Sequence, residues 1–129
     1  MNRPATIAIL DDDPGVREAL TSFVRSLGHA ARAYGSGEAF LAAAEADPDC
    51  LITDIQMPGL SGDALQARLI ASGRPVPMIF MTAFPRAAVR ARVLEAGAAG
   101  FLEKPVDCDE IARLLAVILD DRAPPQTFV

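Results

Sequence analysis

The sequence has 129 residues, of which 51% are hydrophobic and 22% are charged, and its formal net charge is −5. These values are typical of one globular domain and exclude a disordered chain. The acidic excess argues against bulk attraction to nucleic acid or anionic membranes, and no apolar run approaches the roughly 20 residues that cross a bilayer. The opening residues MNRPATIAIL enter a strand-like run at once, without the pattern of a signal peptide. We therefore expect a cytoplasmic domain without nucleic-acid or membrane contacts.

Short apolar runs alternate along the chain with segments of helical periodicity. Residues 6–10 (TIAIL) form a continuous apolar run, which predicts a strand covered on both faces. Asp13 and Pro14 are a favourable N-cap and first position for the helix that follows, and Gly28 is a favourable stop. Further strands are expected at 29–34, 50–54, 77–83 and 99–104, and further helices from Ser36 to about Ala46, from Asp63 to Ser72, over 86–97 and around 111–118.

Five strands alternating with five helices predict an α/β domain with a doubly wound parallel sheet. The segment DDRAPPQTFV has two adjacent prolines and no periodicity, so we expect the domain over residues 1–120 and a linker or tail over 121–129. The two cysteines, Cys50 and Cys108, lie in or beside apolar segments without metal-type spacing. Both are expected to be buried or inert thiols.

Polar side chains gather where the predicted strands end, which is where ligands bind in sheets of this kind. These residues are Asp11, Asp12, Asp54, Thr82 and Lys104. Carboxylate oxygens suit Mg²⁺, and an aspartate carboxylate can act as a nucleophile that forms an acyl phosphate. An ammonium group and a hydroxyl group can both donate hydrogen bonds to phosphate oxygens. The combination predicts a site that makes and holds an aspartyl phosphate.

Four segments resemble the receiver domains of two-component response regulators: ILDDDP, LITDIQMPGLSG, MIFMTA and AGAAGFLEKP. They span nearly the whole chain in the right order. The segment YGSGEAFLAA is also similar to the branch that includes the nitrogen-fixation regulator. The resemblance implies a flavodoxin-like (βα)5 fold with strand order 2-1-3-4-5, and a sensor histidine kinase or phosphotransfer protein as the phosphoryl donor.

The resemblance also implies a role for individual residues. Asp54 is then the phosphoacceptor, and Thr82 and Lys104 contact the phosphoryl group. Phe101 is the aromatic residue whose rotamer follows Thr82 in a switch that alters the surface of the fourth helix and fifth strand. The bond between Lys104 and Pro105 is expected to be cis, which is common only before proline.

The metal site has two alternatives within the aspartate run. The resemblance implies that Asp11 and Asp12 hold Mg²⁺ together with Asp54 and the backbone carbonyl of Gln56. The pair could instead be Asp12 and Asp13, but Asp13 is better used as the helix cap. Gln56 and Phe84 border the expected site, and we expect them to influence how fast water reaches the phosphate.

Two other functions are compatible with parts of this pattern. One is a small phosphohydrolase of the D-x-D type, with Asp11 as nucleophile and Asp13 as acid. The other is an adaptor of receiver fold that is not phosphorylated. Asp54 and Lys104 fit the receiver spacing, and the chain has no cap domain to enclose a substrate, which favours the receiver.

Two predicted helices carry opposite charges, a pattern that is compatible with self-association. The fourth helix is basic, whereas the last helix is acidic (Arg86, Arg90 and Arg92 against Asp107, Asp109, Glu110, Asp120 and Asp121). Two solvated faces would explain this pattern. A homodimer through the fourth helix and fifth strand, as receivers often form, would also explain it.

Overall fold

The computed structural model describes residues 4–43 and 45–122, with side chains up to residue 120. Within this part of the chain, five parallel strands form one sheet in the order β2-β1-β3-β4-β5. The strands are β1 (Thr6–Leu10), β2 (Ala30–Tyr34), β3 (Cys50–Asp54), β4 (Met78–Thr82) and β5 (Gly100–Glu103). The expected doubly wound fold and strand order are confirmed.

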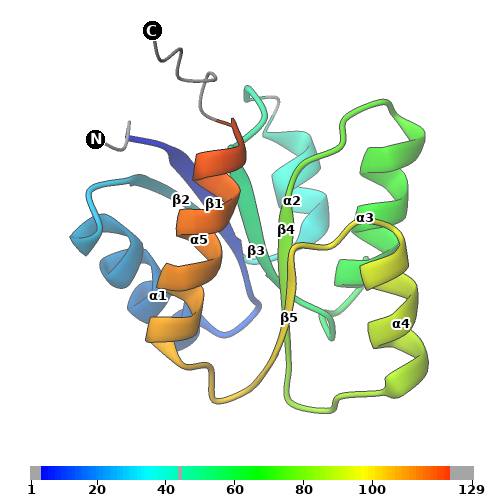
Figure 1. Cartoon of the computed structure of the whole chain (residues 1–129). Helices are drawn as coiled ribbons and strands as arrows, with labels where there is room; N and C mark the ends of the chain where they lie inside the picture. Colours follow the sequence, from blue (N-terminus) through cyan, green and yellow to red (C-terminus); the bar gives the residue numbers. More distant parts are fainter. Residues whose placement is uncertain (1–3, 44, 123–129) are drawn as a thin grey trace, which may run out of the picture.

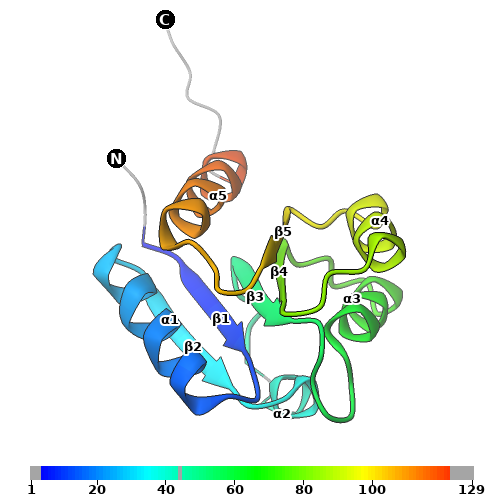
Figure 2. The same cartoon turned by 90° about the horizontal axis from the view of Figure 1, so that it is seen from below.

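Five helices cover the two faces of this sheet (Figure 1). They are α1 (Pro14–Ser26), α2 (Gly37–Ala42), α3 (Gly62–Ala71), α4 (Ala87–Glu95) and α5 (Cys108–Arg122). Figure 2 shows α1 and α5 on one side of the sheet, with α2, α3 and α4 on the other. None of the helices in the described ranges is long and apolar enough to cross a bilayer.

Alternate residues of the strands enter two hydrophobic clusters, one on each face of the sheet. The cluster beneath α1 and α5 includes Ile9, Ile52, Ile79, Leu20 and Ile111. The cluster beneath α2, α3 and α4 includes Leu10, Leu51, Phe80, Leu65 and Val93. Because β1, β3 and β4 are buried on both faces, they have the continuous apolar sequences that made them recognisable.

The entry to α1 follows the predicted pattern. The Asp13 carboxylate accepts a hydrogen bond from the backbone N–H of Gly15 at 2.8 Å, and Pro14 occupies the first turn. Gly28 follows the end of this helix with a φ of 91°, a left-handed conformation that favours glycine. These local features determine where the chain after β1 turns away from the sheet edge.

Helix α2 is shorter than predicted, because it ends at Ala42 and not near Ala46. Glu45 accepts a hydrogen bond from the Tyr34 hydroxyl at 2.9 Å and forms an ion pair with Arg32 at 3.1 Å. Arg32 also donates to the backbone oxygen of Ala46 at 3.0 Å. These contacts tie Glu45 and Ala46 to β2, so tertiary contacts override the helix propensity of these two residues.

Two further expectations concern the last helix. Both cysteines were expected to be buried or inert. Cys108 is the exposed first residue of α5, because Ile111 and Leu115 take the core-facing side of that helix, so for this residue only the second alternative stays a prediction. Cys50 is buried as expected, and burial raises the pKa of its thiol to about 12. Helix α5 continues to Arg122, and residues 123–129 lie outside the described part, so the division into domain and tail stays a prediction.

Candidate functional site

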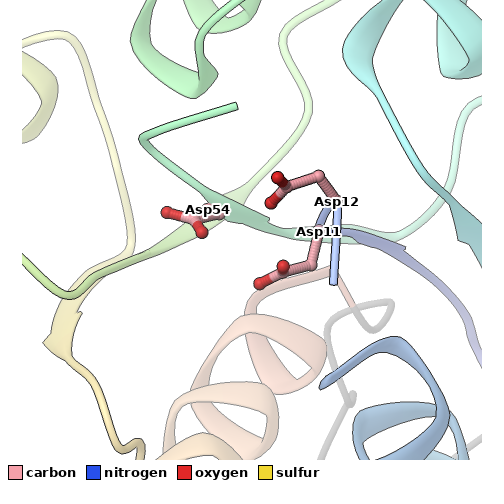
Figure 3. Close-up of side chains that lie close together, drawn as sticks. All are labelled: Asp11, Asp12 and Asp54. Carbon is pink, nitrogen blue, oxygen red and sulfur yellow. The ribbon is translucent and has the colours of Figure 1, made fainter. Parts of the chain in front are cut away.

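Three carboxylates converge at the carboxyl ends of β1 and β3. The two strands are parallel neighbours with Leu10 opposite Thr53, so the residues that follow reach the same edge of the sheet. Asp11 is fully buried and Asp54 is 5% exposed, whereas Asp12 is exposed. One carboxylate oxygen of each residue lies within 4.8 Å of those of the other two, and the three groups face a common space (Figure 3).

Lys104 brings a positive charge to the two buried carboxylates. Its Nζ donates to Asp11 Oδ2 at 2.8 Å and to Asp54 Oδ2 at 2.7 Å. Desolvation lowers the pKa of Lys104, but the hydrogen bonds and charges of Asp11 and Asp54 outweigh it, so the pKa is raised. The backbone N–H of Lys104 donates to the Thr82 carbonyl at 2.8 Å, and the peptide bond to Pro105 is cis, as expected.

Thr82 closes the same edge of the sheet at the end of β4. Its side chain is buried, and its hydroxyl donates to Gln56 Oε1 at 2.7 Å and accepts from the backbone N–H of Phe84 at 3.0 Å. The backbone N–H of Gln56 in turn donates to Asp54 Oδ1 at 3.0 Å. Gln56 therefore connects the threonine hydroxyl at the end of β4 to the Asp54 carboxylate at the end of β3.

The structure distinguishes the roles of the aspartates in the opening run. The cluster of three carboxylates contains Asp11, Asp12 and Asp54 but not Asp13, whose side chain caps α1. The backbone N–H of Asp13 donates to Asp11 Oδ1 at 2.9 Å, which orients the buried carboxylate. This arrangement favours the pair Asp11 and Asp12 over the pair Asp12 and Asp13 as metal ligands.

Phe101 lies apart from this group of polar side chains. It pairs with Phe80 in the register between β4 and β5 and packs, partly buried, against the cluster beneath α2, α3 and α4. Packing explains an aromatic residue here without any further role, so its part in a switch stays a prediction.

Two contacts at the site could not be anticipated from the sequence. The Arg17 side chain donates to the backbone oxygen of Asp11 at 2.7 Å and steadies the loop before α1. The one sequence signal for this contact is that Arg17 lies about one helical turn after the N-cap residue Asp13. The hydrogen bond between Thr82 and Gln56 joins residues 26 positions apart, and no spacing rule identifies it.

Comparison with known proteins agrees with this geometry. The family model described as the response regulator receiver domain matches residues 7–116. This chain belongs to that family. The receiver is 39% identical over 102 residues to the transcriptional regulatory protein FixJ of Azorhizobium caulinodans, which covers 78% of this chain and 48% of that protein. It is 36% identical over 111 residues to the response regulator protein TodT of Pseudomonas putida, which covers 85% of this chain and 49% of that protein.

Solved receiver structures have the same fold. The crystal structure of FixJ-N has a TM-score of 0.83 and 29% identity, covering 97% of this chain and all of that one. A receiver protein from Burkholderia phymatum has a TM-score of 0.76 and 40% identity, covering 95% of this chain and 100% of that one. The receiver described here spans about half the length of the curated relatives named above.

The acidic cluster of this receiver fits the magnesium ion that receiver domains generally bind. Its donors are all carboxylate oxygens, which are the hard ligands that Mg²⁺ prefers. Asp12 is exposed and has no hydrogen bond or ion pair with any described side chain, so its oxygens are available to a cation. A doubly charged ion would also offset the repulsion among three carboxylates held this close.

Proposed function

We propose that this receiver accepts a phosphoryl group on Asp54 from the phosphohistidine of a sensor histidine kinase or a phosphotransfer protein. An Asp54 carboxylate oxygen attacks the phosphorus in line, the P–N bond to the donor histidine breaks, and an acyl phosphate forms. The observation that carries the proposal is the hydrogen bond of 2.7 Å between Lys104 Nζ and Asp54 Oδ2 at the sheet edge. In this contact the Lys104 ammonium group supplies one positive charge beside the carboxylate that would react.

Lys104 alone does not neutralise the negative charge of the phosphoryl group, so a further cation is needed. In our proposal Asp11, Asp12, Asp54 and the backbone carbonyl of Gln56 hold Mg²⁺, which neutralises phosphoryl oxygens when it is bound. Lys104 then donates to one phosphoryl oxygen and the Thr82 hydroxyl to another. All five side chains, those of the three aspartates, Lys104 and Thr82, lie at the carboxyl edge of the sheet, which supports this assignment.

The new charge on Asp54 would change the receiver's output surface. Moving a two-state equilibrium from mostly off to mostly on requires about 5.5 kcal/mol of differential stabilisation, more than one hydrogen bond supplies. We propose that the metal ion, Lys104 and Thr82 act together, that Phe101 follows Thr82, and that the surface of α4 and β5 responds. By analogy with the transcriptional regulatory protein FixJ, the output is control of a partner protein or of transcription in the cytoplasm.

The same surface is our candidate for a homodimer. Arg86, the residue before α4, and Arg90 within α4 are exposed and form no ion pair with any described residue, whereas Arg92 pairs with Asp63 on α3. A partner copy's acidic α5 could satisfy these two charges reciprocally. Sedimentation at increasing concentration should reveal association that depends on beryllofluoride, a phosphoryl mimic. A monomer at every concentration would leave two solvated helix faces as the explanation.

Acetyl phosphate labelling tests the phosphoacceptor assignment. With Mg²⁺, the native chain should gain one phosphoryl group by intact mass, mapped to Asp54, and Asp54→Asn should gain none. The variant Asp13→Asn keeps a good N-cap residue and should label like the native chain. A label on Asp11 would favour the phosphohydrolase, and no label on the native chain would favour an unphosphorylated adaptor.

A further inference from the structure

The hydroxyl of Thr82 has no free hydrogen to offer a phosphoryl oxygen. A threonine hydroxyl carries a single hydrogen, and here that hydrogen is donated to Gln56 Oε1 at 2.7 Å. The oxygen also accepts from the backbone N–H of Phe84 at 3.0 Å. Thr82 is only 1% exposed, so bulk water does not reach the group to replace a lost partner. Any new acceptor for this hydroxyl must therefore displace Gln56.

Gln56 is well placed to act through its side chain alone. Its backbone N–H is held by Asp54 Oδ1 at 3.0 Å, and the residue itself is exposed at the edge of the site. Its amide group makes no hydrogen bond with any described residue except Thr82. The hydrogen bond with Thr82 accounts for the direction of this exposed side chain.

We propose that Gln56 is a positioning residue that holds the Thr82 hydroxyl in the unphosphorylated receiver and competes with the phosphoryl group for it. The inference rests on the proposed phosphorylation of Asp54 and concerns the regulation of that same site. Phosphoryl binding then exchanges one hydrogen bond for another at Thr82, and the strength of the Gln56 bond reduces the driving force of activation. Gln56 thereby stabilises the off state.

The same exchange reaches the surface through Phe84. Its backbone N–H is bonded to the threonine oxygen that would move, and its side chain is 71% exposed, the highest value among the large hydrophobic residues described. If the Thr82 side chain rotates about χ1 to bring its hydroxyl to the phosphoryl group, the oxygen that accepts from the Phe84 N–H moves with it. The competition at Gln56 thus alters the position of the exposed Phe84 side chain just beyond β4.

Beryllofluoride binding in the presence of Mg²⁺ measures this competition directly. Methionine has nearly the length of glutamine but no strong acceptor, so Gln56→Met should release the hydroxyl and bind beryllofluoride roughly three- to tenfold more tightly than the native chain. In a Thr82→Val background, which has no hydroxyl to hold, the ratio between glutamine and methionine should fall to about one. Gln56→Asn, too short to reach Thr82, should resemble Gln56→Met.

An amide resonance gives a second readout that a purely structural role would not produce. Without beryllofluoride, the Phe84 N–H signal of Gln56→Met should shift from its native position towards the position of the beryllofluoride-bound native chain. In the Thr82→Val background the same replacement should leave this signal in place. Urea unfolding of each variant checks that the fold is retained.

The outcomes separate the two proposals. Unchanged or weaker binding by Gln56→Met, or an equal effect with and without the Thr82 hydroxyl, would overturn the role of Gln56 while leaving phosphorylation of Asp54 intact. If the native chain, like the Asp54→Asn variant, does not bind beryllofluoride in the presence of Mg²⁺, both the proposed function and the role of Gln56 are overturned.

Discussion

Lys104 is the residue whose replacement gives the most quantitative expectation. It is the single lysine of the sequence, and its Nζ lies 2.8 Å from Asp11 Oδ2 and 2.7 Å from Asp54 Oδ2. Lys104→Met keeps most of the apolar stem but leaves two carboxylates, 0% and 5% exposed, without their cation. Removing one partner of a buried ion pair costs roughly 3–5 kcal/mol. Because the lysine side chain is 21% exposed, we expect the lower end, about 3 kcal/mol.

Urea unfolding in EDTA and in Mg²⁺ checks this value. With a slope of about 2 kcal/mol per molar urea, the midpoint of Lys104→Met should fall by about 1.5 M in EDTA. The deficit should narrow in Mg²⁺, because the bound ion supplies the positive charge that is lost. Arg113→Met is the control, since it breaks an exposed ion pair with Glu110 and should cost at most about 0.5 kcal/mol. A Lys104→Met deficit no larger than the control's, or one that Mg²⁺ does not reduce, would refute the electrostatic reasoning.

Three further predictions concern the same site. Asp12→Ala should change the free energy of unfolding by less than about 0.5 kcal/mol in EDTA. It should lose the stabilisation that Mg²⁺ gives the native chain, which is about 1.4 kcal/mol at an Mg²⁺ concentration of ten times the dissociation constant. If Mg²⁺ shifted the urea midpoint equally in the variant and the native chain, this prediction would be contradicted. Because the pKa of Lys104 is raised above 10.5, its contribution to stability should persist below pH 10.5 and disappear as the pH rises through the higher folded value. Titration by NMR with the single lysine labelled should give a lower midpoint in Asp11→Asn, and equal midpoints would count against the ion pair. Gly62→Ala should cost roughly 1–3 kcal/mol in urea unfolding, because its Cβ would meet the backbone oxygen of Asp54, and a native-like midpoint would show that the loop can yield.

The strands and the edge of the sheet that carries the site were predictable for a physical reason. Strands such as β3 and β4 are covered by helices on both faces, so their apolar sequences stand out from the rest of the chain. Parallel strands all end at one edge, and the polar residues that directly follow apolar runs there include Asp11 and Asp54. A prediction of the strands therefore located the polar cluster as well.

Features that depend on contacts between distant side chains were not predictable. Helix α2 stops early because Glu45 bonds to side chains of β2, which the alanine-rich sequence around it does not reveal. The apolar neighbours of Cys108 left open whether this thiol is buried or inert, and the phase of α5 places it on the exposed side. The bond between Gln56 and Thr82 depends on the distance between the loop after β3 and the end of β4, which periodicity cannot supply.

The central claim is that the acidic cluster holds a divalent cation beside Asp54. Crystals grown with Mn²⁺ in place of Mg²⁺ and with beryllofluoride test it most directly, because manganese scatters anomalously. We predict one anomalous peak within coordination distance of carboxylate oxygens of Asp11 or Asp12 and of Asp54, next to beryllofluoride on Asp54. A peak elsewhere, or beryllofluoride on Asp54 with no ion among these carboxylates, would contradict the account.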